Sequence, residues 1–204
     1  MYVRPRPRNM SCICHMQCPK TPSMVTHFAP RLLLALGTNR PGPEGEPRDS
    51  LAWALRELES AGVVILRVSD IYKTAPVGAG RQPAYLNAVA VARSALGPTT
   101  LLRLLKSLER RAGRRVTPPL QPRPLDIDIL DLGGRRLNWP APGRKRGGLV
   151  LPHPLLQERA FVLVPLLEVA PHWTHPVLGV PARTLLARLG RNGRRGVRRL
   201  GTLR

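Results

Sequence analysis

Cysteine is scarce in this 204-residue chain, and the three cysteines, Cys12, Cys14 and Cys18, share one N-terminal stretch. With His15 they form C-x-C-H-x3-C, which matches none of the paired C-x-x-C patterns of zinc sites, so zinc binding is the less favoured interpretation. Because no cysteine follows residue 18, we expect no disulfide in the folded part. This composition suits a reducing cytoplasm.

Long apolar runs are absent as well. No stretch reaches the roughly 18 apolar residues needed to span a bilayer. The longest runs are 32–36 and 160–170, and Pro165 interrupts the second. Residues 1–28 have no continuous apolar signal core, and their four prolines argue against an amphipathic transit helix. We expect residues 1–30 to be a disordered basic leader, or the product of a start codon assigned too early, with Met24 as the true start.

Acidic residues are few: 12 Asp and Glu stand against 33 Lys and Arg, for a formal charge of +21. Both ends, residues 1–31 and 183–204, contain basic residues and no acidic ones. The middle part, 32–182, retains a charge of +8, as expected for a domain that binds a polyanion. Arginine-rich ends can bind nucleic acid through its phosphates, but a solvated tail is the favoured interpretation. We therefore expect a leader at 1–30, one domain at 31–182 and an Arg-rich C-terminal tail at 183–204.

Hydrophobic patterning predicts alternating strands and helices. Buried or alternating apolar residues indicate strands at 31–36, 63–72, 85–93 and 125–132. Helical spacing predicts one helix that begins at Asp49 or Ser50 and ends at Gly62, and another from Pro98 to Gly113. Further helices are expected near 158–169 and 181–189. The order β-α-β-β-α-β is typical of the ferredoxin-like α+β sandwich, here with C-terminal additions.

Two aspartates on the last predicted strand are the sharpest chemical signal. Side chains alternate along a strand, so Asp126 and Asp128 share one face, roughly 7 Å apart, while Ile127 points into the core. Two carboxylates so placed repel each other unless a cation lies between them. Oxygen ligands without nearby histidine or cysteine suit Mg²⁺, which takes one or two carboxylates and phosphate oxygens. A solvated polar face is the plain alternative.

Arginines around this pair indicate phosphate chemistry. Arg123 precedes Asp126 by three residues, Arg114 and Arg115 follow the predicted helix, and Arg159 comes after a Pro-His-Pro sequence. Phosphoryl transfer depends mostly on positioning and charge neutralisation, for which such arginines are suited. None of the four lysines stands in a P-loop pattern. A phosphate site here would lack the Walker lysine.

Taken in order, six motifs resemble the 6-hydroxymethyl-7,8-dihydropterin pyrophosphokinase family. They are Gly37-Thr38-Asn39, residues 69–78 (SDIYKTAPVG), residues 82–87 (QPAYLN), Glu109 with Gly113-Arg114, residues 122–128 (PRPLDID), and residues 151–166 (LPHPLLQERAFVLVPL). The resemblance covers about residues 32–171. It implies a cytoplasmic, monomeric transferase that moves diphosphate from ATP to the pterin hydroxyl, releasing AMP, in tetrahydrofolate synthesis.

The same resemblance implies roles for particular residues. Asp126 and Asp128 hold two Mg²⁺ ions, and Arg114 and Arg123 are the catalytic, phosphate-clamping arginines. The residues implied to bind ATP are Lys106, Glu109, Arg115, Ile129, His153 and Arg159. The residues implied to bind the pterin are Thr74, Ala75, Val77, Tyr85, Asn87 and Phe161, with the ring between the two aromatics. Singly, Tyr85 and Phe161 would be taken as core residues and Asn87 as a strand cap.

The lid loop, residues 114–123, departs from the family pattern. It lacks the usual Trp-Gly-Pro-Arg run, has Leu120-Gln121 in place of Trp-Gly, and is one residue shorter. We expect altered lid closure, with Arg115 in place of a missing second arginine. Thr38 and Ala75 replace the usual Ser and Pro.

Two rival functions are weighed against the enzyme. A basic RNA-binding module would need exposed aromatics in the RNP pattern, whereas the predicted central strands carry only Tyr72 and Tyr85, in no such context. A pseudoenzyme with an inactivating lid is the second rival. Every charged group that the reaction requires is present, which disfavours it.

Overall fold

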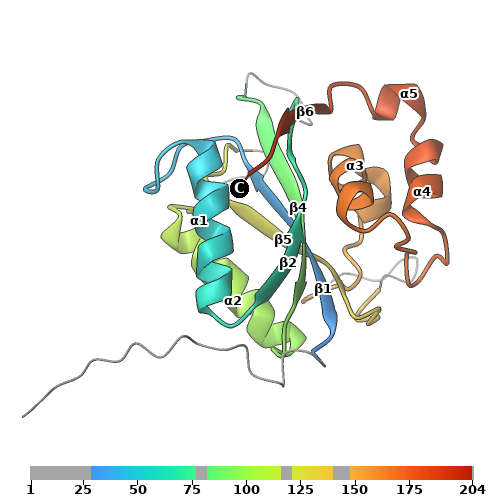
Figure 1. The fold of residues 1–204 in the computed structure, drawn as a ribbon, viewed down its shortest axis with the longest axis horizontal. Coiled ribbons are helices and arrows are strands. Elements are labelled where there is room, and N and C mark those ends of the chain that lie inside the picture. Colours follow the sequence, from blue (N-terminus) through green and yellow to red (C-terminus); the bar gives the residue numbers. More distant parts are fainter. Residues whose placement is uncertain (1–28, 77–81, 116–120, 140–147, 204) are drawn as a thin grey trace, which may run out of the picture.

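A twisted antiparallel sheet forms the middle layer of the protein, with helices on both faces (Figure 1). The computed structural model describes residues 29–76, 82–115, 121–139 and 148–203. Its elements in chain order are β1 (Arg31–Thr38), α1 (Pro47–Ser60), β2 (Val64–Val68), β3 (Ile71–Thr74), β4 (Tyr85–Arg93), α2 (Pro98–Arg111), β5 (Asp126–Leu132), the 3₁₀ turn η2 (Leu156–Glu158), α3 (Ala160–Val169), α4 (Ala182–Arg188), α5 (Gly190–Gly193) and β6 (Arg198–Gly201).

The strand order confirms the ferredoxin-like prediction. Strands lie side by side in the order β5-β1-β4-β3-β6, and β2 also pairs with β4. All the pairings are antiparallel. Helices α1 and α2 cover one face of the sheet, as expected for the β-α-β-β-α-β unit, and α3 and α4 cover the other face (Figure 1). The C-terminal additions therefore supply a third layer.

Strand β1 is buried on both faces, which explains its unbroken apolar sequence. Leu32, Leu34 and Leu36 point toward α1 and α2, while Leu33 packs against α3 on the opposite side. A strand covered on both faces needs apolar residues at successive positions rather than alternate ones. Among the described helices, none is long and apolar enough to cross a membrane.

The strand predicted at 63–72 is interrupted in its middle. It forms β2 and β3, which both pair with β4 on either side of Ser69 and Asp70. The hydroxyl of Ser69 accepts the Val89 backbone N–H at 2.9 Å, and the Asp70 N–H donates to Glu168 at 3.0 Å. The Val89 and Asp70 N–H groups thus donate to side chains instead of to backbone carbonyls. The regular backbone pairing with β4 is therefore interrupted at Ser69 and Asp70, as in a β-bulge.

Helix α1 begins earlier than the sequence predicts. The sequence predicts a start at Asp49 or Ser50, but Pro47 is the first helical residue and Glu46 is the cap. Proline suits this position because the first helical N–H has no partner within the helix. Asp49 lies in the first turn and accepts the Glu46 N–H at 3.0 Å. The other predicted helices occur at the predicted places, with α2 again opened by a proline, Pro98.

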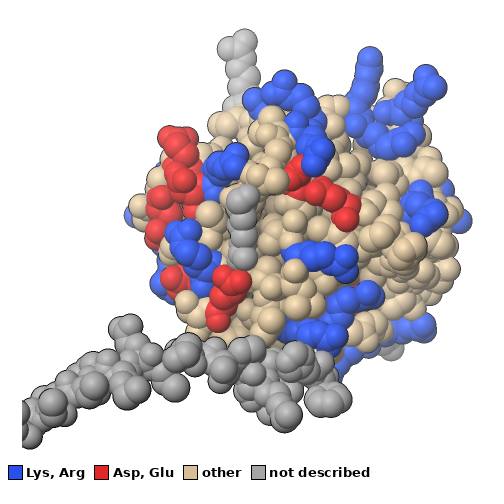
Figure 2. Space-filling view, in the orientation of Figure 1, with Lys and Arg blue, Asp and Glu red and all other residues tan. Residues whose placement is uncertain are grey.

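The arginine-rich C-terminal residues fold onto the domain, which differs from the tail expected at 183–204. Residues 182–188 form α4 and residues 190–193 form α5. Strand β6 pairs with β3, and Leu203 is buried. Figure 2 shows basic side chains gathered over α5 and β6, and acidic ones over α1. The leader at 1–28, with its cysteines, lies outside the described residues.

His175 is a fully buried titratable group behind α3 and α4. Its ring meets Trp139 and Trp173 edge-on, with centroids 5.0 and 5.6 Å away. Its Nδ1 accepts backbone N–H groups from Val177 and Leu178 at 3.3 and 3.1 Å. Nδ1 is therefore unprotonated, and the neutral ring carries its proton on Nε2.

We predict that His175 makes folding stability fall at acid pH. Burial lowers the pKa of His175, and the Asp131 charge only partly opposes this. In the unfolded chain His175 is protonated as the pH falls below about 6.5, whereas in the folded protein it stays neutral to lower pH. The free energy of unfolding therefore decreases as the pH falls below that value. Thermal unfolding between pH 7.5 and 5.5 should show a smaller decrease in His175→Asn, which keeps an acceptor at the Nδ1 position. An identical decrease in both proteins would contradict this assignment.

Candidate functional site

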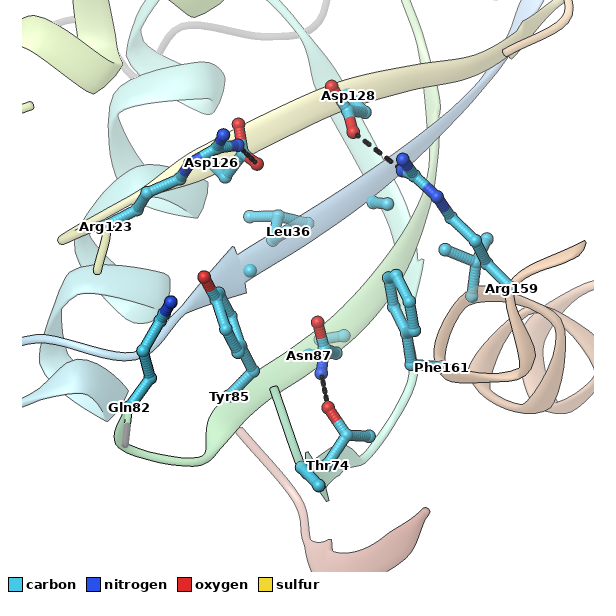
Figure 3. A pocket seen from close by; sticks show the side chains of 15 residues that line it. Leu36, Thr74, Gln82, Tyr85, Asn87, Arg123, Asp126, Asp128, Arg159 and Phe161 are labelled. Carbon is cyan, nitrogen blue, oxygen red and sulfur yellow. Dashed lines mark hydrogen bonds and ion pairs between the residues drawn. The ribbon is translucent and has the colours of Figure 1, made fainter. Parts of the chain in front are cut away.

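Strand β5 presents two acids on the sheet face opposite α1 and α2. Ile127 and Ile129 pack into the core against those helices. Asp126 and Asp128 point the other way, into an open part of the sheet face (Figure 3), and are 23% and 33% exposed. The alternation predicted from the sequence therefore holds.

Asp126 is held between two arginines. Nη1 of Arg123 lies 2.6 Å from Oδ2, and Nη1 of Arg114 contacts Oδ1. Burial by itself raises the pKa of Asp126, but the two guanidinium groups outweigh it and the net pKa lies below the usual range of an aspartate. The carboxylate is therefore ionised at neutral pH.

Glu109 supports this arrangement from α2. Its buried carboxylate accepts the Ile127 backbone N–H at 2.9 Å and pairs with Arg114 at 2.9 Å and Lys106 at 2.7 Å. Burial raises the pKa of Glu109, and the Ile127 hydrogen bond and the two cations oppose that rise. The Glu109 side chain thus holds both the start of β5, through Ile127, and the guanidinium group of Arg114.

Asn39 holds the backbone of Arg123 in place. Its side-chain Oδ1 accepts the Arg123 backbone N–H at 2.7 Å, and its backbone N–H donates to the Arg123 carbonyl at 3.1 Å. Its amide also donates to the Pro83 carbonyl at 3.3 Å, which joins the segment before β4 to the segment before β5. Asn39 belongs to the Gly37-Thr38-Asn39 motif, but the sequence does not predict these bonds because Arg123 and Pro83 lie far along the chain.

His153 and Arg159 approach Asp128 from the far side. The His153 Nε2 and Arg159 Nη1 atoms each lie 3.7 Å from Asp128 Oδ2. A backbone bond of 3.0 Å from the His153 N–H to the Leu130 carbonyl places the histidine beside β5. Burial, aided by Arg159, lowers the pKa of His153 although Asp128 opposes it. The ring is therefore neutral at neutral pH.

A cavity of about 200 Å³ opens beside the two acids. Tyr85 and Phe161 stand on opposite sides of Asn87 in its wall (Figure 3). The Asn87 amide donates to the Thr74 hydroxyl at 2.9 Å, and both side chains are buried. The cavity thus combines aromatic walls, an amide edge and, at its other end, carboxylates and arginines.

The structure brings some of the expected residues to this cavity and not others. Thr74, Ala75, Tyr85, Asn87, Arg123, Asp126, Asp128, Arg159 and Phe161 line it. The described lining does not include Lys106, Glu109, Arg114 or His153. Arg114 and His153 lie next to the two acids, and Glu109 pairs with Arg114 and Lys106. Ile129 is 4% exposed and packs in the core, so its side chain does not reach the cavity. Val77 and lid residues 116–120 lie outside the described residues.

Arg115 lines a second, basic cavity next to the first. Arg40, Arg114 and Arg123 share its wall, together with glycines and prolines of the surrounding loops. Arg40 was not predicted as a site residue. The only sequence signal for it is its place directly after Gly37-Thr38-Asn39.

The donor set fits magnesium better than zinc. In the part of the chain that the structure describes, no three histidine, cysteine, aspartate or glutamate side chains cluster as a metal site. Zinc usually takes three or four such protein ligands, whereas Mg²⁺ is satisfied by one or two carboxylates with water and phosphate oxygens. Asp126 and Asp128 supply that pair.

Comparison with known sequences gives one consistent family. The family described as 7,8-dihydro-6-hydroxymethylpterin-pyrophosphokinase (HPPK) matches residues 33–171. The chain is 37% identical over 139 residues to the 2-amino-4-hydroxy-6-hydroxymethyldihydropteridine pyrophosphokinase of Synechocystis sp., covering 68% of this chain and 67% of that one. The enzyme of the same name from Pseudomonas aeruginosa is 37% identical over 142 residues, 69% of this chain and 81% of that one.

Larger relatives share only one part of their length with this chain. The mitochondrial folate synthesis bifunctional protein of Arabidopsis thaliana is 38% identical over 138 residues, which is 68% of this chain but 23% of that protein. Among solved structures, a Plasmodium falciparum HPPK-DHPS superposes with a TM-score of 0.62 at 16% identity, over 84% of this chain and 49% of that one. At that identity the likeness establishes the fold alone.

We predict that Glu109→Gln lowers the free energy of unfolding by about 1–3 kcal/mol, because Lys106 and Arg114 then lose a buried counter-charge. Urea denaturation followed by circular dichroism measures this. Glu57→Gln is the matched control, since Glu57 pairs with Arg111 at the surface and its removal should change stability by less than about 1 kcal/mol. Equal stability of Glu109→Gln and the parent protein would show that Glu109 does not support the site.

Proposed function

Because the chain belongs to the 7,8-dihydro-6-hydroxymethylpterin-pyrophosphokinase family, we propose that it transfers the diphosphate of ATP to 6-hydroxymethyl-7,8-dihydropterin in tetrahydrofolate biosynthesis. The pterin hydroxyl oxygen bonds to the β-phosphorus, and the bond from that phosphorus to the oxygen of the α-phosphate breaks. AMP leaves with that oxygen, the hydroxyl proton is released, and the pterin diphosphate remains.

One observation carries the proposal: acids and arginines meet at one end of a cavity whose other end is aromatic. Tyr85 and Phe161 suit the two faces of a flat heterocycle. The Asn87 amide donates to Thr74, and none of the described residues donates to its oxygen. A side-chain amide can bond the polar edge of such a ring. Ala75 and Val77 are proposed to complete the pterin contacts.

Asp126 and Asp128 are the proposed ligands of two Mg²⁺ ions. When bound, magnesium supplies positive charge to the phosphate oxygens and orients the nucleophile. Asp126 is already ionised by its arginine neighbours, and both carboxylates face the cavity.

Arginines and the histidine position the triphosphate in this proposal. Arg114 and Arg123 exchange their bonds to Asp126 for bonds to phosphate oxygens, which leaves Asp126 free for metal. Arg159 and His153 hold phosphate oxygens on the Asp128 side. Guanidinium groups suit this task because they bind phosphate oxygens in pairs. Lys106, Glu109 and Arg115 contribute to the nucleotide side, as does Ile129 through its backbone.

The partners are proposed to be small molecules only, with the protein a cytoplasmic monomer and no specific nucleic acid bound. Deletion of residues after 182 would remove β6, so substitution is the better test of nucleic-acid binding.

A triple variant, Arg191→Gln with Arg194→Gln and Arg195→Gln, neutralises three exposed arginines in and next to α5. We predict that any RNA gel shift weakens while AMP formation is unchanged; a gel shift as strong as that of the parent protein would contradict the proposal. Light scattering measures the molar mass of the parent protein in solution, and a monomer should give the chain mass of 22.5 kDa.

We predict that Asp126→Ala and Asp128→Ala each reduce AMP formation by at least about 100-fold, because charge stabilisation of the transferring group is lost. The assay contains purified protein, ATP, Mg²⁺ and 6-hydroxymethyl-7,8-dihydropterin, with AMP followed by chromatography. Glu57→Gln, a surface carboxylate variant, should keep parent activity, and circular dichroism checks each fold. An active double variant would refute the metal assignment, and an inactive parent protein would favour a pseudoenzyme.

A further inference from the structure

The last strand of the chain lies along the outer edge of β3 (Figure 1). Strand β6 places Arg199 opposite Tyr72 and Arg198 opposite Lys73. A contact from the Arg48 side chain to the Thr202 carbonyl ties the following residues to α1. The arginine-rich end of the protein is therefore built into the sheet.

Strand β3 depends on this neighbour because it is only four residues long. On its other side it pairs with β4, with Tyr72 opposite Asn87 and Thr74 opposite Tyr85. Thr74 is its last residue and accepts the Asn87 amide in the cavity wall. Edge strands with free backbone groups are readily frayed, so β6 protects the strand that orients Asn87.

An ion pair between Arg199 and Asp70 joins β6 to the start of β3. Asp70 is 4% exposed, whereas the Arg199 side chain is 67% exposed. Among the described residues, Asp70 has no other ion pair. A buried carboxylate is costly without a counter-charge, so the position of Asp70 depends on β6 being in place.

Glu168 extends this network to α3. One carboxylate oxygen accepts the Asp70 N–H and the other accepts the Tyr72 hydroxyl, both at 3.0 Å. Burial and the Glu168 charge raise the pKa of Tyr72 to about 12, so the hydroxyl stays a donor. Phe161 lies seven residues before Glu168 on the same helix, two turns away. The network therefore links the three elements that carry Thr74, Asn87 and Phe161 to the cavity.

We infer that Arg199 is a positioning residue for the pterin side of the cavity, acting through Asp70 and β3 on the Thr74–Asn87 pair. The inference deepens the proposed function and rests on it, since the pterin is the ligand that this wall would bind. The part of the nucleotide side built on β5 and α2 lies beyond β1 and β4 in the sheet and has no contact with this network among the described residues. Arg159 precedes α3 and lies nine residues from Glu168.

The test compares Arg199→Ala with Arg198→Ala, the adjacent arginine of β6, for which the described residues show no ion pair. Dissociation constants are measured separately for the hydroxymethyl dihydropterin, by fluorescence, and for a non-hydrolysable ATP analogue with Mg²⁺, by calorimetry. In Arg199→Ala we expect the pterin constant to rise about tenfold, equivalent to about 1.4 kcal/mol, with the nucleotide constant unchanged. Arg198→Ala should change neither, and Arg199→Lys, which keeps the charge, should recover much of the affinity.

An unchanged pterin constant in folded Arg199→Ala, or an equal loss of nucleotide affinity, would overturn the inference. The rate of hydrogen exchange at the Ile71–Thr74 amides distinguishes failure of this inference from failure of the proposed function. Faster exchange in Arg199→Ala but not in Arg198→Ala supports the positioning role even if the parent protein binds no pterin, in which case the proposed function fails. Equal exchange in both variants counts against the role of Arg199.

Discussion

The contact of Asp126 with Arg114 and Arg123 is the interaction on which the site depends. Arg114 lies three residues after the end of α2, and Arg123 lies three residues before the start of β5. One carboxylate therefore holds both ends of the segment between these elements. Asp128 stands two residues further along the same face, and two such charges repel each other. The arginines offset this repulsion in the free protein, which lets two neighbouring acids stand on the same face of β5.

The same charges that stabilise the free protein are the ones that the proposed reaction uses. A triphosphate offers the arginines stronger oxygen acceptors than a single carboxylate. In the proposed reaction the arginines turn to the phosphates, and the charge of Asp126 then becomes available, with that of Asp128, to a hard divalent cation. Glu109 and Asn39 keep the arginine backbones in place, so only the side chains need to move.

The cavity exists because the helices on the second sheet face do not cover all of it. Strands β1 and β4 are apolar on both faces where α3 packs on them. Helix α3 starts at Ala160, and Arg159 and Phe161 at its start border the part of the sheet that stays open (Figure 3). The guanidinium carbon of Arg159 lies 5.7 Å from the Phe161 ring centroid, so the phosphate end and the aromatic wall meet at this helix terminus.

The sequence by itself determined the strand and helix order, the shared face of Asp126 and Asp128, and the family, because these follow from periodicity and from motifs that are local in the chain. It could not locate the break at Ser69 and Asp70, since that break depends on bonds to Val89 and Glu168. It also could not show that Asn39 binds the backbone of Arg123, or that the arginine-rich end pairs with β3. Only the tertiary structure decided these points, because hydrogen bonds and ion pairs between residues tens to more than a hundred positions apart leave no periodic trace in the order of the amino acids.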